Sequence, residues 1–221
     1  MKIKKLPLLI LAMSLTVLVA CKENKNKTNP KEATAAADVS QASKFMVDKE
    51  ASEIKWEGKK PAGTHHGTVK LESGIVKSMG DSISGSFLID MKSISVEDLT
   101  GEDKEKLENH LKGTVKDKET DFFNVTKYPT AAFEITGITE KEGKKMLAGN
   151  LTLKDAKKNI EFPATYKLDG DTMTLKSEPF TIDRTQWNVN YGSKSVFDNL
   201  KDNFINDDIT LTIDIVAKRQ M

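Results

Sequence analysis

Three histidines and an Asp-Arg pair are the residues of this chain whose side chains could most readily do chemistry. His65 and His66 are adjacent, so on a β-strand their rings point to opposite faces and cannot easily bind one metal ion together. His110 stands far along the chain, so a three-histidine site would need a fold that brings all three together. We therefore predict no metal site, with one histidine at the surface and the other hydrogen-bonding at the end of a strand.

Arg184, which follows Asp183, carries a planar fork of hydrogen-bond donors that fits carboxylates or backbone oxygens. A structural role is the favoured interpretation of this side chain. Contact with the polar head of a ligand is the alternative.

Charge and motifs exclude several classes of function. The chain has 34 basic and 33 acidic side chains, and its lysines are spread out, which is typical of a solvated surface and unlike a nucleic-acid-binding patch. It contains no HExxH motif, P-loop, GxGxxG motif or nucleophile elbow, and its serines and carboxylates are not spaced as a triad. The sequence therefore predicts no enzyme, no catalytic residue and no cofactor.

Hydrophobic residues recur with a period of two along most of the chain, which is typical of half-buried β-strands. The clearest case is 208–217, where Ile209, Leu211 and Ile213 share one face. The other alternating segments are 52–58, 67–74, 82–91, 130–136, 146–154, 159–168 and 172–180. One short helix is predicted near 102–112, with acids in its first turn, bases in its last, and Leu107 and Leu111 in a buried stripe. This pattern predicts an all-β barrel or sandwich with one helix.

The stretch 121–135 carries four aromatic residues in a chain that has few of them. Pro129 biases Tyr128 toward extended backbone and cannot donate to a sheet, so a loop is predicted to lead into a strand here. Adjacent side chains on an extended chain point to opposite sides. Phe122 and Phe123 are therefore predicted to separate, with only one of them contacting a ligand.

Residues 1–20 have the features of an export signal, because early lysines precede an apolar run that is short for a membrane-spanning helix. The run ends in Leu18-Val19-Ala20-Cys21, which resembles the lipobox of bacterial lipoproteins. That resemblance implies cleavage before Cys21 and a lipid anchor on its side chain. An incidental free cysteine behind an ordinary signal peptide is the alternative.

The residues after the lipobox bear on location. Cys21 is the only cysteine, so an exported form cannot make an internal disulfide. Lys22 stands in place of the aspartate that retains lipoproteins at the inner membrane of Gram-negative cells, which favours the outer membrane, on its periplasmic side or surface. Residues 21–43 are polar and lack aromatics, so we predict a lipidated cysteine on a flexible tether and a folded domain over 44–221.

Several blocks of sequence, in order, resemble the YceI-like family of exported lipid- or polyisoprenoid-binding proteins. The blocks are DFFNVTKYPTAAF at 121–133, His66-Gly67, LENHLK at 107–112, GNLTL at 149–153 and FTIDRT at 180–185. They extend over 45–217, and together with the lipobox they identify the chain as a lipoprotein member of that family.

The resemblance implies an eight-stranded antiparallel lipocalin-like β-barrel with an apolar cavity for a long isoprenoid or another amphiphile. The implied function is carriage, storage or sequestration of that ligand in the cell envelope. Strand glycines, including Gly67 and Gly149, are expected to make room in the interior. The residues expected to contact the ligand are Trp56, Phe87, Phe122, Phe123, Phe133, Leu151, Arg184, Trp187 and Tyr191.

Two alternatives stay open. Side chains could fill the barrel, which would leave a non-enzymatic interaction or stress-response module without a ligand. A hydrolase or heme-type redox protein on the same barrel would need an activated serine or an axial histidine facing a cavity. The expected partners are a hydrophobic small molecule and the membrane reached through the lipid anchor. The sequence leaves open whether the chain also forms a homodimer.

Overall fold

The computed structural model describes residues 26–39 and 42–220. The signal peptide predicted over 1–20 and the lipid attachment predicted at Cys21 lie outside these residues. No described helix is long and apolar enough to cross a membrane.

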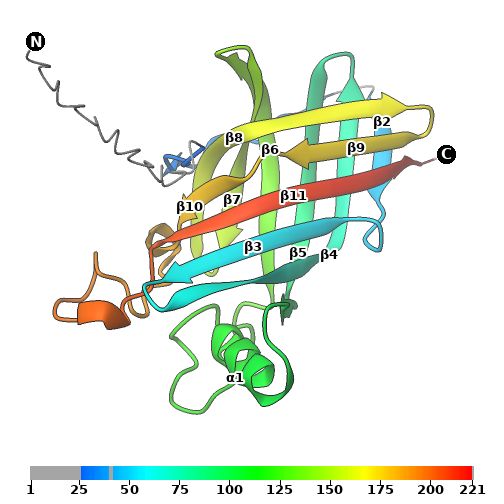
Figure 1. Ribbon diagram of the computed structural model, residues 1–221. Helices are drawn as coiled ribbons and strands as arrows, with labels where there is room; N and C mark the ends of the chain where they lie inside the picture. Colours follow the sequence, from blue (N-terminus) through cyan, green and yellow to red (C-terminus); the bar gives the residue numbers. More distant parts are fainter. Residues whose placement is uncertain (1–25, 40–41, 221) are drawn as a thin grey trace, which may run out of the picture.

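Eight strands form a closed ring in which neighbouring strands are antiparallel (Figure 1). In chain order they are β3 (Glu53–Lys60), β4 (Gly63–Met79), β5 (Ser82–Val96), β6 (Thr130–Lys141), β7 (Lys144–Leu153), β8 (Ala156–Asp169), β9 (Thr172–Ser177) and β11 (Asp208–Arg219). The ring closes because β3 pairs with β4 on one side and with β11 on the other. The eight-stranded antiparallel barrel is therefore confirmed, and the sandwich alternative is wrong.

Three short strands complete the sheet. β2 (Ser43–Val47) continues the line of β3 between β4 and β11, and β1 (Lys31–Glu32) pairs with β8. β10 (Phe180–Asp183) continues the line of β9 along β11. The segment 172–180, predicted as one strand, is interrupted at Glu178 and Pro179, where proline has no amide hydrogen to donate.

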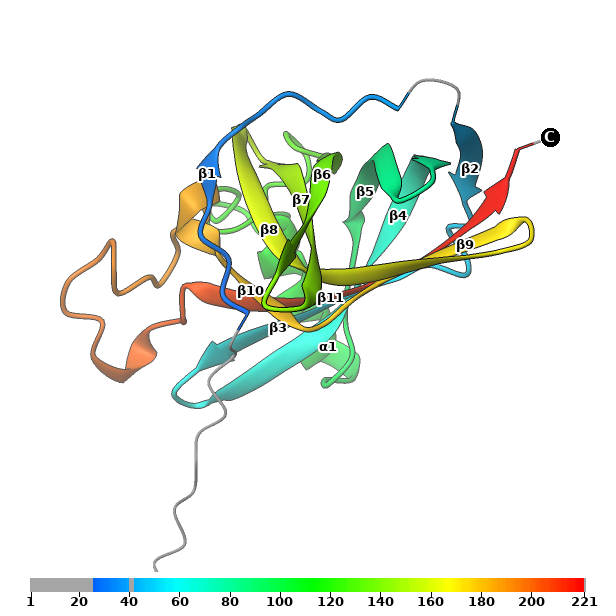
Figure 2. The same ribbon diagram turned by 90° about the horizontal axis from the view of Figure 1, so that it is seen from above.

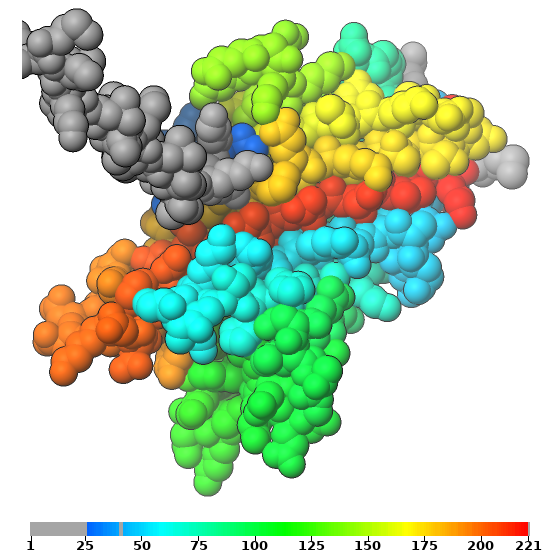
Figure 3. Space-filling model, viewed as in Figure 1, coloured from blue at the N-terminus to red at the C-terminus, as the bar shows by residue number. Residues whose placement is uncertain are grey.

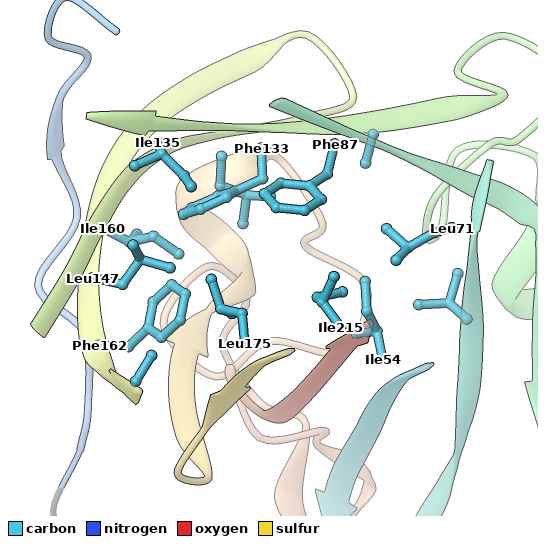
Figure 4. Packing of buried hydrophobic residues seen from close by; sticks show 14 of the residues in the cluster. Ile54, Leu71, Phe87, Phe133, Ile135, Leu147, Ile160, Phe162, Leu175 and Ile215 are labelled. Atoms are coloured by element: carbon cyan, nitrogen blue, oxygen red, sulfur yellow. The ribbon is translucent and has the colours of Figure 1, made fainter. Parts of the chain in front are cut away.

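Apolar side chains from every strand of the ring point into the barrel, as Figure 4 shows for ten labelled residues. Four rings form a row from β5 to β10. The ring centroids of Phe87 and Phe133 are 6.4 Å apart, those of Phe133 and Phe162 are 5.8 Å apart, and those of Phe162 and Phe180 are 4.1 Å apart. We call these four residues the aromatic row; they fill one part of the interior with protein.

The strand glycines Gly67 and Gly149 do not make room for a ligand, contrary to the prediction. A Cβ atom at Gly149 would overlap the ring of Phe133, so this ring occupies the space that the glycine leaves. A Cβ atom at Gly67 would overlap the backbone of Ser95 on the neighbouring strand. Both glycines permit another part of the same chain to approach the strand closely, and neither lines the cavity described below.

Replacing Gly149 with alanine is expected to lower the free energy of unfolding by about 1–3 kcal/mol, because the new methyl group must displace Phe133. Equilibrium unfolding in urea measures this change. Gly137→Ala is the matched control, since a Cβ atom there meets nothing within 4 Å. Equal effects at the two glycines would contradict the role given to the aromatic row.

The single α-helix, α1 (Gly101–Lys112), connects β5 to β6 and lies at the lower end of the barrel in Figure 1. Its first turn carries Glu102 and Asp103 and its last turn carries His110 and Lys112, as the sequence predicted. Gly113 ends the helix with a φ of 70°, a conformation in which glycine pays no steric cost. The chain then returns through turns to β6, which places the aromatic stretch beside the end of the helix.

Residues 26–39, which we call the N-terminal arm, lie against the outside of the barrel (Figure 2), so the prediction of a flexible tether is wrong for this part. The amide of Thr28 donates to β10 at 2.8 Å, and Val39 is 8% exposed. The buried Asn150 side chain accepts from the Thr34 amide at 3.1 Å and donates to the Thr34 carbonyl at 2.7 Å. Composition misled because this arm is ordered by polar pairing with the barrel, which needs little apolar surface of its own.

Replacing Asn150 with alanine is expected to loosen the N-terminal arm, because both backbone groups of Thr34 lose their side-chain partner. Leaving such groups unpaired should cost about 1–3 kcal/mol of unfolding free energy. Limited proteolysis should then cut within 26–39 faster than in the unmodified protein. Thr152→Ala, two residues along the same face of β7, is the control, and equal protease sensitivity of the two variants would refute this attachment.

Candidate ligand cavity

A cavity of about 480 Å³ opens at the end of the barrel that carries α1. Its size falls within the range of about 300–1,000 Å³ that is usual for small-molecule sites. Inward-facing strand residues make most of the wall: Ile54, Trp56, Val69, Ile89, Met91, Ile94, Ala131, Leu151, Leu153, Ile182, Ile209 and Leu211. Leu107 and Leu111 of α1, with Phe122 and Phe123 of the aromatic stretch, add an apolar cover from outside the strands.

The aromatic row lies deeper in the barrel than the residues that line this cavity. On β6 the wall residue Ala131 is followed two positions deeper by Phe133, and on β10 the wall residue Ile182 lies two positions from Phe180. Side chains two apart on a strand face the same side, so each ring lies directly beyond a wall residue. We therefore expect the aromatic row to limit how deep a ligand tail can reach.

The structure brings six of the nine predicted contact residues to the wall: Trp56, Phe122, Phe123, Leu151, Arg184 and Tyr191. Phe87 and Phe133 lie instead in the aromatic row. Trp187 is fully buried in the short 3-10 helix η1 (Arg184–Trp187), where its indole N–H donates to the Leu151 carbonyl at 3.0 Å. Sequence alternation indicates which side of a strand faces inward, but it does not indicate depth along the barrel, which separates core from cavity.

Phe122 and Phe123 both line the cavity, so the prediction that they separate is wrong. They lie among the turns between α1 and β6, where the alternation of an extended strand does not apply. The amide of Phe123 donates to the Leu111 carbonyl at 3.1 Å. This bond ties the aromatic stretch to the end of the helix, and both rings line the cavity beside it.

His110 joins Phe122 and Tyr191 in a cluster of three rings at the cavity wall. Its ring centroid lies 5.0 Å from that of Phe122 and 4.9 Å from that of Tyr191, both in edge contacts. His110 Nε2 lies 2.7 Å from a carboxylate oxygen of Asp121, which fixes the orientation of the imidazole. The cluster joins α1, the aromatic stretch and the segment after η1 into one side of the cavity.

His65 lines the same cavity from β4, and its Nδ1 lies 2.7 Å from Asp98 Oδ2. Burial raises the pKa of Asp98, but hydrogen bonds from the His66 amide and the His65 ring together lower it more, so this pKa lies below its usual value. His66 is exposed, as expected for one of the two adjacent histidines. Among the described residues, no group of three or more His, Cys, Asp or Glu side chains could hold a metal ion.

Arg184 is 1% exposed at the edge of the cavity. Its guanidinium donates to the carbonyls of Asn206 at 3.1 Å, Val189 at 2.6 Å and Ile205 at 3.1 Å. Burial lowers the pKa of Arg184, while Asp207, 3.6 Å away, acts in the opposite direction. All three of its nitrogen atoms contact backbone carbonyls, which favours the structural interpretation: the side chain holds the segment before β11 against the barrel.

Two loops that are far apart in the sequence frame the mouth of the cavity. Lys59, Lys60 and Ala62 come from the tip of the β3–β4 hairpin, while Asp202, Asn203 and Asn206 come from the segment between η1 and β11. The β3–β4 hairpin and that segment lie side by side in the space-filling view (Figure 3). An apolar interior with a polar rim suits an amphiphile whose apolar tail lies inside and whose polar head stays at the rim.

Sequence reasoning missed most of the aliphatic wall. Ile54, Ile209 and Leu211 lie on faces that the period-two pattern points inward, so the signal was present. It did not separate them from core residues, because aliphatic strand residues look alike in both settings. Leu107 and Leu111 were predicted as a buried stripe, yet no residue of α1 is buried, since this stripe faces the cavity.

The model of the YceI-like domain family matches residues 45–217 of this chain. Among solved structures, BcnA of Burkholderia cenocepacia is 21% identical, with a TM-score of 0.59 over 77% of this chain and 98% of that one. A polyisoprenoid binding domain from Saccharophagus degradans, implicated in plant cell wall breakdown, is 13% identical, with a TM-score of 0.54 over 81% and 100% of the two chains. These likenesses show a shared fold. No curated protein sequence matches this chain.

Proposed function

Because this chain belongs to the YceI-like domain family, we propose that it binds a long-chain isoprenoid or a similar amphiphile in the barrel cavity. The tail lies against the apolar wall, and the polar head stays at the rim. The protein then carries, stores or sequesters this lipid and performs no catalysis on it.

The apolar wall is the observation that carries the proposal. Strands, helix and aromatic stretch all contribute apolar side chains to one cavity, which opens at a polar rim. Each Å² of apolar surface removed from water contributes about 25 cal/mol, and a hydrocarbon tail needs no hydrogen-bond partner. The ligand named for the Saccharophagus domain supports the same ligand class.

The polar head would meet several groups near the mouth. His65, His110 and Tyr191 face the cavity from three different elements. The two histidines are each held by a carboxylate, so their rings offer fixed rather than mobile partners. We assign Arg184 a structural role rather than a head-group contact, since three of its five N–H groups donate to backbone carbonyls.

The proposal includes lipid attachment at Cys21 and a location in the cell envelope, with the outer membrane favoured in a Gram-negative cell. The lipobox at 18–21 and Lys22 support it. A permanent anchor of this kind needs more than one acyl chain, because each buried methylene contributes only about 0.8 kcal/mol.

Displacement of a fluorescent apolar dye tests the ligand class. For this experiment the protein is produced without Cys21, as secreted residues 22–221. It then carries no lipid anchor and needs no detergent. Long-chain isoprenoid alcohols should displace the dye, whereas short-chain alcohols with the same head should not, because they leave most of the wall in contact with water. Absence of dye uptake together with no binding of any long-chain lipid would favour the alternative of a module without a ligand.

A further inference from the structure

The loop at 190–206, between η1 and β11, exposes apolar side chains beside the cavity mouth. Val196 is 47% exposed and Phe197 is 48% exposed. The amides of both residues donate to the Ser193 carbonyl, at 3.4 Å and 2.9 Å, and this tight turn presents the two side chains together. Neither residue lines the cavity, so ligand binding does not account for their exposure.

We propose that this loop contacts the surface of the bilayer in which Cys21 is anchored, so that the cavity mouth faces the membrane. The inference rests on the lipid anchor proposed above. Apolar groups of this size at the end of a loop are the kind that insert between lipid head groups. The occupant of this surface is therefore a phospholipid bilayer, not a second protein.

The N-terminal arm limits how far the barrel can stand from its anchor. Only four residues separate Cys21 from Asn26, the first described residue. Five residue steps can span at most roughly 17 Å. Lys27 then forms an ion pair of 2.8 Å with Asp208, the first residue of β11, directly after the loop. The attachment of the arm thus brings the anchor to the side of the barrel that carries the loop.

The two ribbon views agree on which side of the barrel carries the loop and the N-terminal arm. The 190–206 loop and β1 lie on one side of the barrel, while the β8–β9 turn and the C-terminal end of β11 lie on the other (Figures 1 and 2). Asp202, Asn203, Ile205 and Asn206 belong to the loop and also line the cavity. A membrane that touches the loop therefore meets the mouth, and a lipid could pass between bilayer and cavity with little exposure to water.

The loop carries no net charge, which bears on the kind of lipid it would contact. Lys194 and Lys201 are balanced by Asp198 and Asp202 within 190–206. Contact should therefore depend on apolar insertion and should not require anionic lipids. Vesicles of zwitterionic phosphatidylcholine are the appropriate probe.

Site-specific fluorescence quenching tests the orientation in the full lipidated protein. Cys21 is the only cysteine, so once it is acylated an introduced cysteine is the single reactive thiol. Phe197→Cys carries the environment-sensitive dye. Leu168→Cys, near the β8–β9 turn, is the matched control, since Leu168 is 42% exposed and Phe197 is 48% exposed. Each protein is reconstituted into phosphatidylcholine vesicles that contain spin-labelled lipid.

The dye at position 197 should shift its emission to shorter wavelength and lose most of its intensity, while the dye at 168 should lose little. Equal quenching at both positions, or none at either in protein that floats with the vesicles, would overturn the orientation alone. Protein that does not float with the vesicles would overturn the anchor and this inference together. The cavity proposal would still stand or fall on dye displacement in solution.

A second measurement tests whether the loop helps a ligand to move from the bilayer into the cavity. Val196→Ser combined with Phe197→Ser should slow the movement of an apolar dye from vesicles into the cavity, with its affinity in solution unchanged, since neither residue lines the cavity. An unchanged transfer rate would contradict a role for the loop at the membrane.

Discussion

Replacing Arg184 with methionine is expected to lower the free energy of unfolding by about 3–5 kcal/mol, because it removes a buried cation that donates three hydrogen bonds. Three backbone carbonyls would lose their donor, and Asp207 would lose its nearby positive charge. The segment before β11 should loosen as a consequence. Urea unfolding measures the first effect, and hydrogen exchange of the Val189 and Ile205 region measures the second.

Arg219→Met is the control for this prediction. Arg219 also bonds a carboxylate, that of Asp171 at 2.9 Å, but it lies at the surface, where such pairs contribute roughly 0–1 kcal/mol. Similar losses of stability for the two arginine variants would contradict the structural role assigned to Arg184.

Replacing Ala131 with tryptophan is expected to weaken binding of a long-chain ligand at least about tenfold, equivalent to about 1.4 kcal/mol. Ala131 lines the cavity just above the aromatic row, so an indole there must occupy the space of the ligand tail. The open cavity can take the larger side chain, so stability should change far less than binding. Dye displacement and urea unfolding measure the two quantities on the same protein.

Ala132→Trp controls for the added side chain. Ala132 follows directly on β6 and faces outward, so its variant carries the same indole outside the cavity. Its affinity should stay close to that of the unmodified protein. Equal loss of binding in both variants would mean that the site of binding is not this cavity.

The architecture was largely predictable from sequence, because a barrel repeats one simple pattern. The alternation in β11 and its neighbours, and the charges at the two ends of α1, each depend on residues close together in the chain. The N-terminal arm was not predictable by the same reasoning, since its order depends on Asn150 and β10, which are distant in sequence.

The types of residue that form the site were predictable from the sequence, but their positions along the barrel were not. Trp56 and Tyr191 line the cavity, while Phe87 and Phe133 lie in the core, because depth along the barrel depends on the tilt and register of whole strands. A glycine on an inward-facing strand position, such as Gly149, is compatible with empty space for a ligand or with a closely packed side chain. The position of the Phe133 ring against Gly149 shows that the side chain is packed there. The meeting of His65 and His110 in one cavity likewise depends on the return of the chain after β5.

The central claim is that the cavity holds a long-chain lipid. Its most direct test is to purify residues 22–221 from the periplasm without detergent, extract them with organic solvent and quantify the extract by mass spectrometry. We expect a long-chain isoprenoid or similar amphiphile at close to one molecule per protein, and its loss in the Ala131→Trp variant. A protein that is isolated empty and takes up no long-chain lipid when one is supplied would contradict it.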